Sequence, residues 1–481
     1  MKSSFFQLLL LLSLASQSSP WFDFDDYEIE FIYSSLQKHC NISDDRYSFS
    51  PHSIWVLEAV IKQLKDSSLS QDCNFYVEKL ENIILESLNT NVSIGFQSKV
   101  NKLYLQEKGF RYYDRSNAYI DINSTHKNFA YKIKTIKSSE EIFFDESYVA
   151  YKNNNTIYKL GRVKRWWSPS DFTSLIYSNS MRPIPTISIS NYNPINSNSK
   201  FFYFINNFNY EVFIGKLERN REIPNTLIFG NRASFSPYPN LNISLFRVAQ
   251  YGGKGRVNNS KTFKYVLSGK DTVNRNLTFN EQSGNQIAGI DFSYKVDYKN
   301  NIHIYGQYLG EDGLDPIIDD RWIGAIFPSK RFGMGGISIN SNNPHNLWKI
   351  TLEHTNTDTG TKNVTYNHSL YKSGYRYHNT PIGAGIDGDS HNTILNFDKF
   401  YQHGSLQLKY QKMSINQNNS INHSLSSKEF TNEELLLKLS RYYRNNFNIS
   451  LNFVIRDSSN YEYQNNYFFI RLEKVLQLAS N

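Results

Sequence analysis

Apolar and polar side chains alternate along most of the chain after about residue 91. Ile290, Phe292 and Tyr294 alternate with Asp291 and Ser293. The same alternation returns in three later segments, 406–410, 435–439 and 447–456. A period of two predicts β-strands with one apolar and one polar face. At about 10 residues per membrane strand and a connection of similar length, residues 91–481 accommodate on the order of 18 strands, an even number that lets a sheet close without an edge.

The segment before these strands has a helical period instead. Apolar residues at Ile29, Ile32 and Leu36 share one helix face, and two further amphipathic stretches span about 51–64 and 72–88. Helices this short are marginal alone in water, so we expect them to pack together or against the mouth of the strand domain. Residues 23–90 are therefore predicted to form a small helical head, and residues 91–481 a separate β domain.

The first residues have the layout of a secretory signal peptide. Lys2 precedes an apolar stretch from Phe5 to Leu14, and Ser13 and Ala15 provide small residues for cleavage, so residues 1–18 are predicted to be removed on export. The apolar stretch is too short to span a bilayer, and no later run reaches the roughly 18 apolar residues of a transmembrane helix. Any residence in a membrane must therefore use strands.

The composition fits a membrane barrel better than a helical membrane protein. The 481 residues are 39% hydrophobic and 15% aromatic, yet the mean hydropathy is −0.54. A barrel combines these values because one face of each strand meets lipid and the other a polar lumen, while aromatic residues form girdles at the two interfaces. A secreted β-sandwich or propeller is also aromatic, so composition alone leaves that alternative open.

The formal charge is +8, from 52 basic and 44 acidic side chains. The basic residues are interleaved with acidic ones and form no stripe, which argues against nucleic acid as a partner. The positive sign favours anionic partners at a cell surface, namely lipopolysaccharide or an acidic polysaccharide.

The only two cysteines, Cys40 and Cys73, both lie in the predicted helical head. In an exported protein a single disulfide is the simplest account, and a buried pair of free thiols is the alternative. No metal site is implied.

The segment 160–185, LGRVKRWWSPSDFTSLIYSNSMRPIP, places three arginines around Trp166 and Trp167. This arrangement suits cation–π contact, carboxylate pairing or sugar stacking. The segment resembles the signature of the Wzi-type capsule assembly family, outer-membrane barrels of encapsulated Gram-negative bacteria. Further matches follow in the family order, at 216–225, 230–232, 247–253, 306–312 and 374–390.

The resemblance implies a transmembrane antiparallel β-barrel in the outer membrane, with the helical head in the periplasm and loops at the cell surface. It also implies a lectin-like protein that anchors capsular or extracellular polysaccharide. Outer-membrane lipids and the polysaccharide export machinery are the other partners expected. The alternative function on the same fold is a porin-like solute channel, in which charged residues of the lumen set selectivity.

Twelve residues within or beside the family-like motifs are candidates for the functional site. They form either a polysaccharide-binding surface or an interior network that holds the barrel occluded, and the interior network is favoured because the motifs read as strands and tight Gly or Pro turns. The candidates are Arg162, Arg165, Trp166, Trp167, Arg182, Arg232, Arg247, Glu311, Asp312, Arg376, Asp387 and Asp389.

Catalytic signatures are missing from the sequence. There is no G-x-S-x-G elbow, no H-E-x-x-H helix and no P-loop, and the histidines are scattered. Asp387 and Asp389 could form a carboxylate pair for sugar chemistry, but pairing with arginines is the favoured interpretation. The sequence therefore predicts a protein that is not an enzyme and needs no cofactor.

Overall fold

The alternating segments form β-strands that close into one antiparallel barrel. The computed structural model describes residues 32, 36, 40, 54–65, 70–87, 90–100, 108, 113–196, 205–268, 284–297, 301–311, 330–341, 343, 346–401, 403–443 and 447–478. Within this part of the chain the main sheet has 19 strands, and 18 of them form the wall once the two-residue β4 (Ile142–Phe143) is set aside. The predicted number of strands is confirmed.

Each wall strand pairs with its neighbour in the sequence, and β1 also pairs with β21 to close the ring. The wall strands are β1 (Thr90–Gln97), β2 (Asn117–His126), β3 (Phe129–Ser138), β5 (Tyr148–Asn153), β6 (Thr156–Arg162), β7 (Pro185–Asn191), β8 (Asn206–Lys216), β9 (Leu227–Tyr238), β10 (Leu241–Tyr251), β11 (Asn285–Asp297), β12 (Ile302–Glu311), β13 (Lys330–Asn340), β14 (Trp348–Asn356), β17 (His391–Tyr401), β18 (Gly404–Ile415), β19 (Phe430–Tyr443), β20 (Phe447–Ser458) and β21 (Tyr467–Leu478). A separate hairpin pairs β15 (Arg376–Tyr377) with β16 (Thr380–Pro381).

The wall is apolar outside and polar inside. On β18, Gln407, Lys409 and Gln411 point inward and are buried, whereas Leu408 and Tyr410 point outward and are exposed. A water-soluble sandwich would bury the apolar face and expose the polar one. The observed arrangement is that of a barrel surrounded by lipid, so the sandwich and propeller alternatives are excluded.

The two ends of the barrel differ in the length of their connections. At one end, called the turn end, hairpins such as 126–129, 153–156 and 401–404 join the strands tightly. At the other, called the loop end, connections are longer, and two of them, 163–184 and 357–390, fold back into the lumen. Their aromatic and aliphatic side chains form one buried cluster with the inner wall, including Trp167, Leu175, Tyr177, Phe213, Leu309, Tyr366, Tyr375 and Ile382. We call these two segments the plug.

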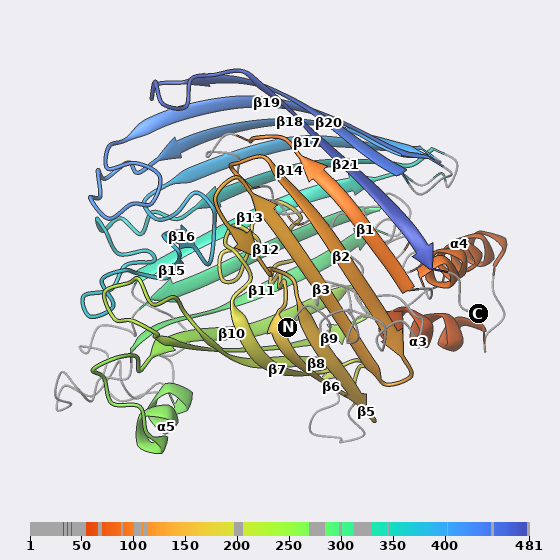
Figure 1. Ribbon diagram of the computed structural model, residues 1–481, viewed down its shortest axis with the longest axis horizontal. Helices are drawn as coiled ribbons and strands as arrows, with labels where there is room; N and C mark the ends of the chain where they lie inside the picture. Colours follow the sequence, from red (N-terminus) through yellow and green to blue (C-terminus); the bar gives the residue numbers. More distant parts are fainter. Residues whose placement is uncertain are drawn as a thin grey trace, which may run out of the picture.

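Two helices, α3 (Ile54–Lys65) and α4 (Gln71–Ser87), lie at the turn end, opposite the β15–β16 hairpin (Figure 1). Their apolar faces pack together and, with Ile32 and Leu36, against Leu347 and Phe400. Both of these latter residues belong to turn-end hairpins, so the helices rest on that mouth of the barrel, as the sequence predicts.

A disulfide links Cys40 to Cys73 of α4, with the two Cα atoms 5.2 Å apart. The bond ties the segment before α3 to the start of α4. The predicted signal peptide, residues 1–18, and the predicted starts of the first two head helices lie outside the described residues.

A third helix, α5 (Ser260–Ser268), lies at the loop end outside the wall and is a feature that the sequence patterns did not predict (Figure 1). Among the described residues, no helix is long and apolar enough to cross a bilayer.

Candidate functional site

A carboxylate on the inner wall holds the tryptophan-containing part of the plug. Glu211 points inward from β8 and binds Arg165 Nε at 3.0 Å and Lys159 Nζ at 2.9 Å through its Oε1 atom. Its Oε2 accepts a hydrogen bond from Trp167 Nε1 at 3.2 Å. The guanidinium of Arg165 also lies 4.6 Å from the ring centroid of Phe213. Arg165 and Trp167 are buried, and together they fasten the segment 163–184 to the wall.

Trp166 is equally buried, but its indole N–H bonds within its own segment and not to the wall. Its Nε1 donates to the backbone carbonyl of Ser170 at 2.6 Å. The same plug segment also contacts a second wall strand, β12, through the side chain of Gln307. This side chain accepts a hydrogen bond from the Leu175 N–H at 2.7 Å and donates one to the Trp167 carbonyl at 2.6 Å. Neither indole face is available to a sugar in this arrangement, because both tryptophans are core residues of the plug.

Two arginines converge on Asp145, a buried carboxylate in the loop-end connection between β4 and β5. Arg182 forms a bidentate pair with Asp145, at 2.7 and 3.0 Å, and its guanidinium lies 4.1 Å from the ring centroid of Phe143. Arg162 Nη1 is 3.9 Å from Asp145 and donates to Tyr377 Oη at 3.2 Å. Asp145 is fully buried, whereas both guanidiniums keep part of their surface exposed. Since the two cations face one carboxylate, this node has a net positive charge.

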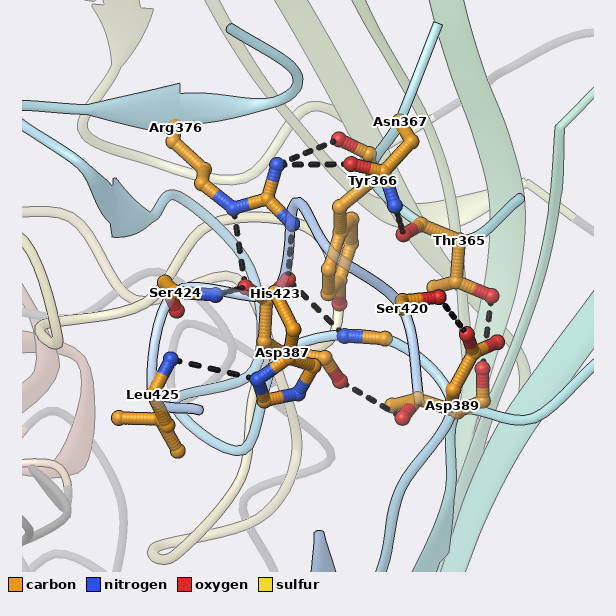
Figure 2. Close-up of polar contacts among 12 residues, drawn as sticks. Thr365, Tyr366, Asn367, Arg376, Asp387, Asp389, Ser420, His423, Ser424 and Leu425 are labelled. Carbon is orange, nitrogen blue, oxygen red and sulfur yellow. Dashed lines mark hydrogen bonds and ion pairs between the residues drawn. The ribbon is translucent and has the colours of Figure 1, made fainter. Parts of the chain in front are cut away.

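The second plug segment is fixed by Arg376 and Asp387 (Figure 2). Arg376 donates from Nε and Nη2 to the two oxygens of Asp387 at 2.9 and 2.8 Å, and from Nη1 to Asn367 Oδ1 at 2.9 Å. The Ser424 N–H, from the β18–β19 connection, donates to the same carboxylate at 2.8 Å. The pair therefore joins two loop-end connections.

Electrostatics at this pair favour the ionised carboxylate. Burial raises the pKa of Asp387, but the charge of the Arg376 guanidinium and the hydrogen bonds from Arg376 and Ser424 act with the nearby His423 to lower the pKa to about 2. His423 packs close by, with its Nε2 3.2 Å from the Ile386 carbonyl, and burial lowers the pKa of its imidazole. The node thus holds an ion pair beside a neutral histidine near pH 7.

Asp389 has partners of its own (Figure 2). It accepts from Ser420 Oγ at 2.6 Å and from the Asn363 N–H at 3.0 Å. Asp387 and Asp389 both adopt left-handed backbone conformations, with φ of 62° and 50°, which aspartate tolerates better than most residues. With each carboxylate occupied by separate donors, the two do not form the opposed acid and base that glycoside hydrolysis requires.

The remaining candidates are spread over the wall. Arg232 Nη2 lies 3.1 Å from Asp291 and 3.0 Å from Ser244 Oγ inside the lumen. Glu311, at the end of β12, accepts the Tyr366 N–H of the plug at 2.6 Å. Arg247 instead points outward and donates to the Val266 and Leu267 carbonyls of α5. Asp312 lies outside the described residues.

The structure therefore differs from the sequence interpretation in three respects. The first is that Asp389 binds Ser420 and Asn363 and not the predicted arginine. Six of the candidates lie in irregular parts of the plug and not in strands, so no periodic pattern of burial marks them in the sequence. They are Arg165, Trp166, Trp167, Arg182, Asp387 and Asp389. Arg247 is not part of the lumen, since the alternation of β10 turns it to the outer face.

Sequence reasoning foresaw that Asp387 pairs with an arginine, but it missed the carboxylates that bind Arg165 and Arg182 and the histidine beside Asp387. Glu211 had a usable signal, because it is an acidic residue at an inward position between the outward Tyr210 and Val212 of an alternating strand. Asp145 and His423 had none, since each lies in an irregular connection. Among the described residues no cluster of histidine, cysteine, aspartate and glutamate side chains has the geometry to hold a metal ion. Chemically, the arrangement is suited to rigid positioning of the loop end.

The sequence matches a known protein family over most of its length. The family described as "Capsule assembly protein Wzi" matches residues 96–468. An uncharacterised 55.8 kDa protein in the cps region of Klebsiella pneumoniae is 27% identical over 193 residues, which are 40% of this chain and 36% of that protein. The match thus spans about a third of that relative's length.

Solved structures share the fold. Wzi of Escherichia coli, an outer-membrane protein involved in group 1 capsule assembly and described as a carbohydrate-binding β-barrel, superposes with a TM-score of 0.79 at 18% identity, covering 97% of this chain and all of that one. The OccD3 (OpdP) structure from Pseudomonas aeruginosa superposes with a TM-score of only 0.44 at 9% identity, covering 81% of this chain and 92% of that one.

Proposed function

This chain belongs to the Wzi capsule assembly family, and from that premise we propose that it binds capsular or extracellular polysaccharide and holds it at the surface of the outer membrane. Attachment of this kind requires no catalytic group. Sugar binding through wet surface contacts is weak per site, and many copies on one cell supply retention through multivalency.

The proposed orientation places α3 and α4 in the periplasm and the loop end at the cell surface. Outer-membrane barrels have short periplasmic turns and longer external loops, and the described connections differ between the two ends in this way. The Cys40–Cys73 bond also suits the oxidising periplasm. Lipids around the wall and the polysaccharide export machinery, approached from the helical head, are the other partners in this proposal.

The single observation that carries the proposal is the filled loop end of the barrel. The plug is fixed to the wall from beneath by Glu211, Gln307 and Glu311. Side chains above it are therefore presented on a rigid platform, and little conformational entropy is lost when they bind a ligand. A solute channel would need the space that these buried residues occupy.

We propose that the polymer contacts exposed groups on this platform. His378 lies at the tip of the β15–β16 hairpin, in a two-residue turn with Asn379 in which both φ angles are positive. Tyr461, in the β20–β21 connection, is 87% exposed and offers a ring face for sugar stacking. The partly exposed guanidiniums of Arg162 and Arg182 suit acidic sugars.

The test measures polymer in the cell-attached and cell-free fractions of a strain lacking the protein, complemented with variants. Deletion should move polymer to the cell-free fraction while total polymer barely changes. Tyr461→Ala should weaken retention with normal barrel yield, whereas Tyr238→Ala, a matched tyrosine that is 69% exposed at the turn end, should have no effect.

Two results would contradict the proposal. Full retention of polymer in the deletion strain would remove the anchor function. Steady conductance of the purified protein in a planar bilayer, with loss of solute uptake in the deletion strain, would replace it with a channel.

A further inference from the structure

Helix α5 covers part of the outer wall at the loop end. Outward side chains elsewhere on β9 and β10 are half-buried or exposed, as at Leu245, which is 50% exposed. Three outward residues beneath the helix are buried instead: Phe229 at 5%, Ala249 at 0% and Tyr251 at 3%. Phe263 of α5 packs on two of them, with ring centroids 5.6 Å from Phe229 and 5.8 Å from Tyr251.

The register of the sheet gives the height of the helix on the wall. Phe229 pairs with Ile214 of the neighbouring strand β8, and Ile214 points outward and is exposed. The helix therefore lies level with the last exposed apolar residues on this side of the barrel. In a membrane, this is where the acyl chains end and the head groups begin.

Both ends of α5 are fixed. The Asn259 side chain accepts the Thr262 N–H at 2.9 Å and caps the N-terminus. Arg247, from the outer wall, donates to the carbonyls of Val266 and Leu267 at the C-terminus, where carbonyls have no partner within the helix. A helix of 9 residues would be marginal alone. These contacts give it a defined orientation on the wall.

The outer side of the helix and of the turn before it is basic and apolar. Residues 252–268 contain four basic side chains and no acidic one. Lys254, Lys261 and Lys264 are exposed, as are the apolar Val257 and Leu267. Exposed lysines beside exposed apolar groups, on a helix at the edge of an apolar band, are typical of a segment that lies in a membrane interface.

We infer that residues 252–268, which we call the rim helix segment, bind the phosphate groups of a phosphorylated glycolipid in the outer leaflet. Lys254, Lys261 and Lys264 supply the positive charge, since lysine is a compact cation that pairs with phosphate. Val257 and Leu267 contact the adjoining acyl region. The inference rests on the proposed outer-membrane location. It assigns the segment to lipid and not to the polymer because the helix, with the exposed Leu267 beside Arg247, lies at the level of the wall's apolar edge.

The test uses the full chain, purified in detergent, with bisphosphorylated lipid A as the probe and native mass spectrometry as the measurement. The variant Lys254→Gln/Lys261→Gln/Lys264→Gln should bind the probe at least tenfold more weakly than the unsubstituted chain. The control Lys362→Gln/Lys372→Gln/Lys428→Gln removes three exposed lysines from other loop-end connections and should bind normally. Binding by the unsubstituted chain should fall as salt rises, and dephosphorylated lipid A should bind weakly.

All proteins must first show the same shift in gel mobility between unheated and boiled samples, so that a folding defect is not read as a binding defect. Equal binding of lipid A by both triple variants would overturn the inference. So would a rim variant that keeps its lipid but no longer binds purified acidic polysaccharide, because the site would then belong to the polymer. Loss of lipid A binding by the rim variant, with its polymer retention unchanged, supports the inference. Lipid A binding is measured separately from polymer retention in the deletion strain, so the inference can hold even if the anchor proposal fails.

Discussion

Substituting Asp387 with asparagine should open one part of the plug while leaving the barrel closed. Asparagine preserves the size of the side chain and tolerates the left-handed backbone at this position, where φ is 62°. The change removes only the negative charge, and the buried guanidinium of Arg376 loses its ionic partner. Breaking a buried ion pair in this way costs about 3–5 kcal/mol.

Asp389 supplies a matched control. It lies two residues further on with φ of 50°, and its partners are the Ser420 hydroxyl and the Asn363 N–H instead of an arginine. Asp389→Asn should therefore cost only about 1 kcal/mol. The two substitutions are chemically identical, so the difference between them isolates the ion pair.

Hydrogen–deuterium exchange of the folded protein in detergent measures the difference directly. Because about 1.4 kcal/mol corresponds to a factor of ten, Asp387→Asn should raise the opening equilibrium of 357–390 by about a hundredfold or more. Wall strands such as β2 and β3 should keep their protection, since local opening is separate from global unfolding. Equal exchange in the two variants would refute the assignment of Arg376 and Asp387 as the main fastening of this segment.

The buried charges of the plug, the disulfide of the head and the buried tryptophan each have a measurable consequence. The pKa of Asp387 is lowered to about 2 and that of His423 is lowered by burial, so both groups bind fewer protons in the folded plug than in the open one. Exchange protection of the plug should therefore fall below about pH 6.5 as His423 is protonated, and fall further between about pH 4 and 2 as Asp387 is protonated. Protection that rises on acidification would contradict this sign. Intact-mass labelling without reductant should find no alkylatable thiol at Cys40 or Cys73, and reduction should lower the stability of the helical head by about 3 kcal/mol, whereas two labelled thiols in the unreduced protein would refute the bond. Trp167→Ala should lower the yield of folded barrel at a cost of about 3–5 kcal/mol, and a variant that folds normally yet releases polymer would show that this residue belongs to the binding surface.

The barrel was predictable from the sequence because its strands bury and expose residues with a period of two that only a few register shifts interrupt. The segment 287–297 shows its two faces directly, with Asp291 inward and Ile290 outward. The plug was not predictable in the same way. Its positions are fixed by single polar contacts, such as Tyr366 to Glu311, and by left-handed turns, and neither leaves a repeating signal.

Helix α5 was missed for a different reason. It has only 9 residues, and its apolar face is complete only when Phe263 meets Phe229, a residue distant in the sequence. The candidate site was predicted in part, since the sequence identified Arg165, Trp167, Arg376 and Asp387 but not the carboxylate Glu211 that binds the first two of them.

The way in which the plug is fastened also determines how the protein bears a mechanical load. A polymer tethered near the β15–β16 hairpin, as proposed above, would pull on the plug whenever flow drags the polymer. That tension would reach β12 through the hydrogen bond between Tyr366 and Glu311, and the β18–β19 connection through the Ser424 N–H that Asp387 accepts. From β12 it spreads through the continuous ladder of a closed sheet, which has no free edge strand to peel away. The plug is held by individual hydrogen bonds and ion pairs, whereas the wall is one closed ladder, so sustained shear should pull the plug loose before it extracts the barrel.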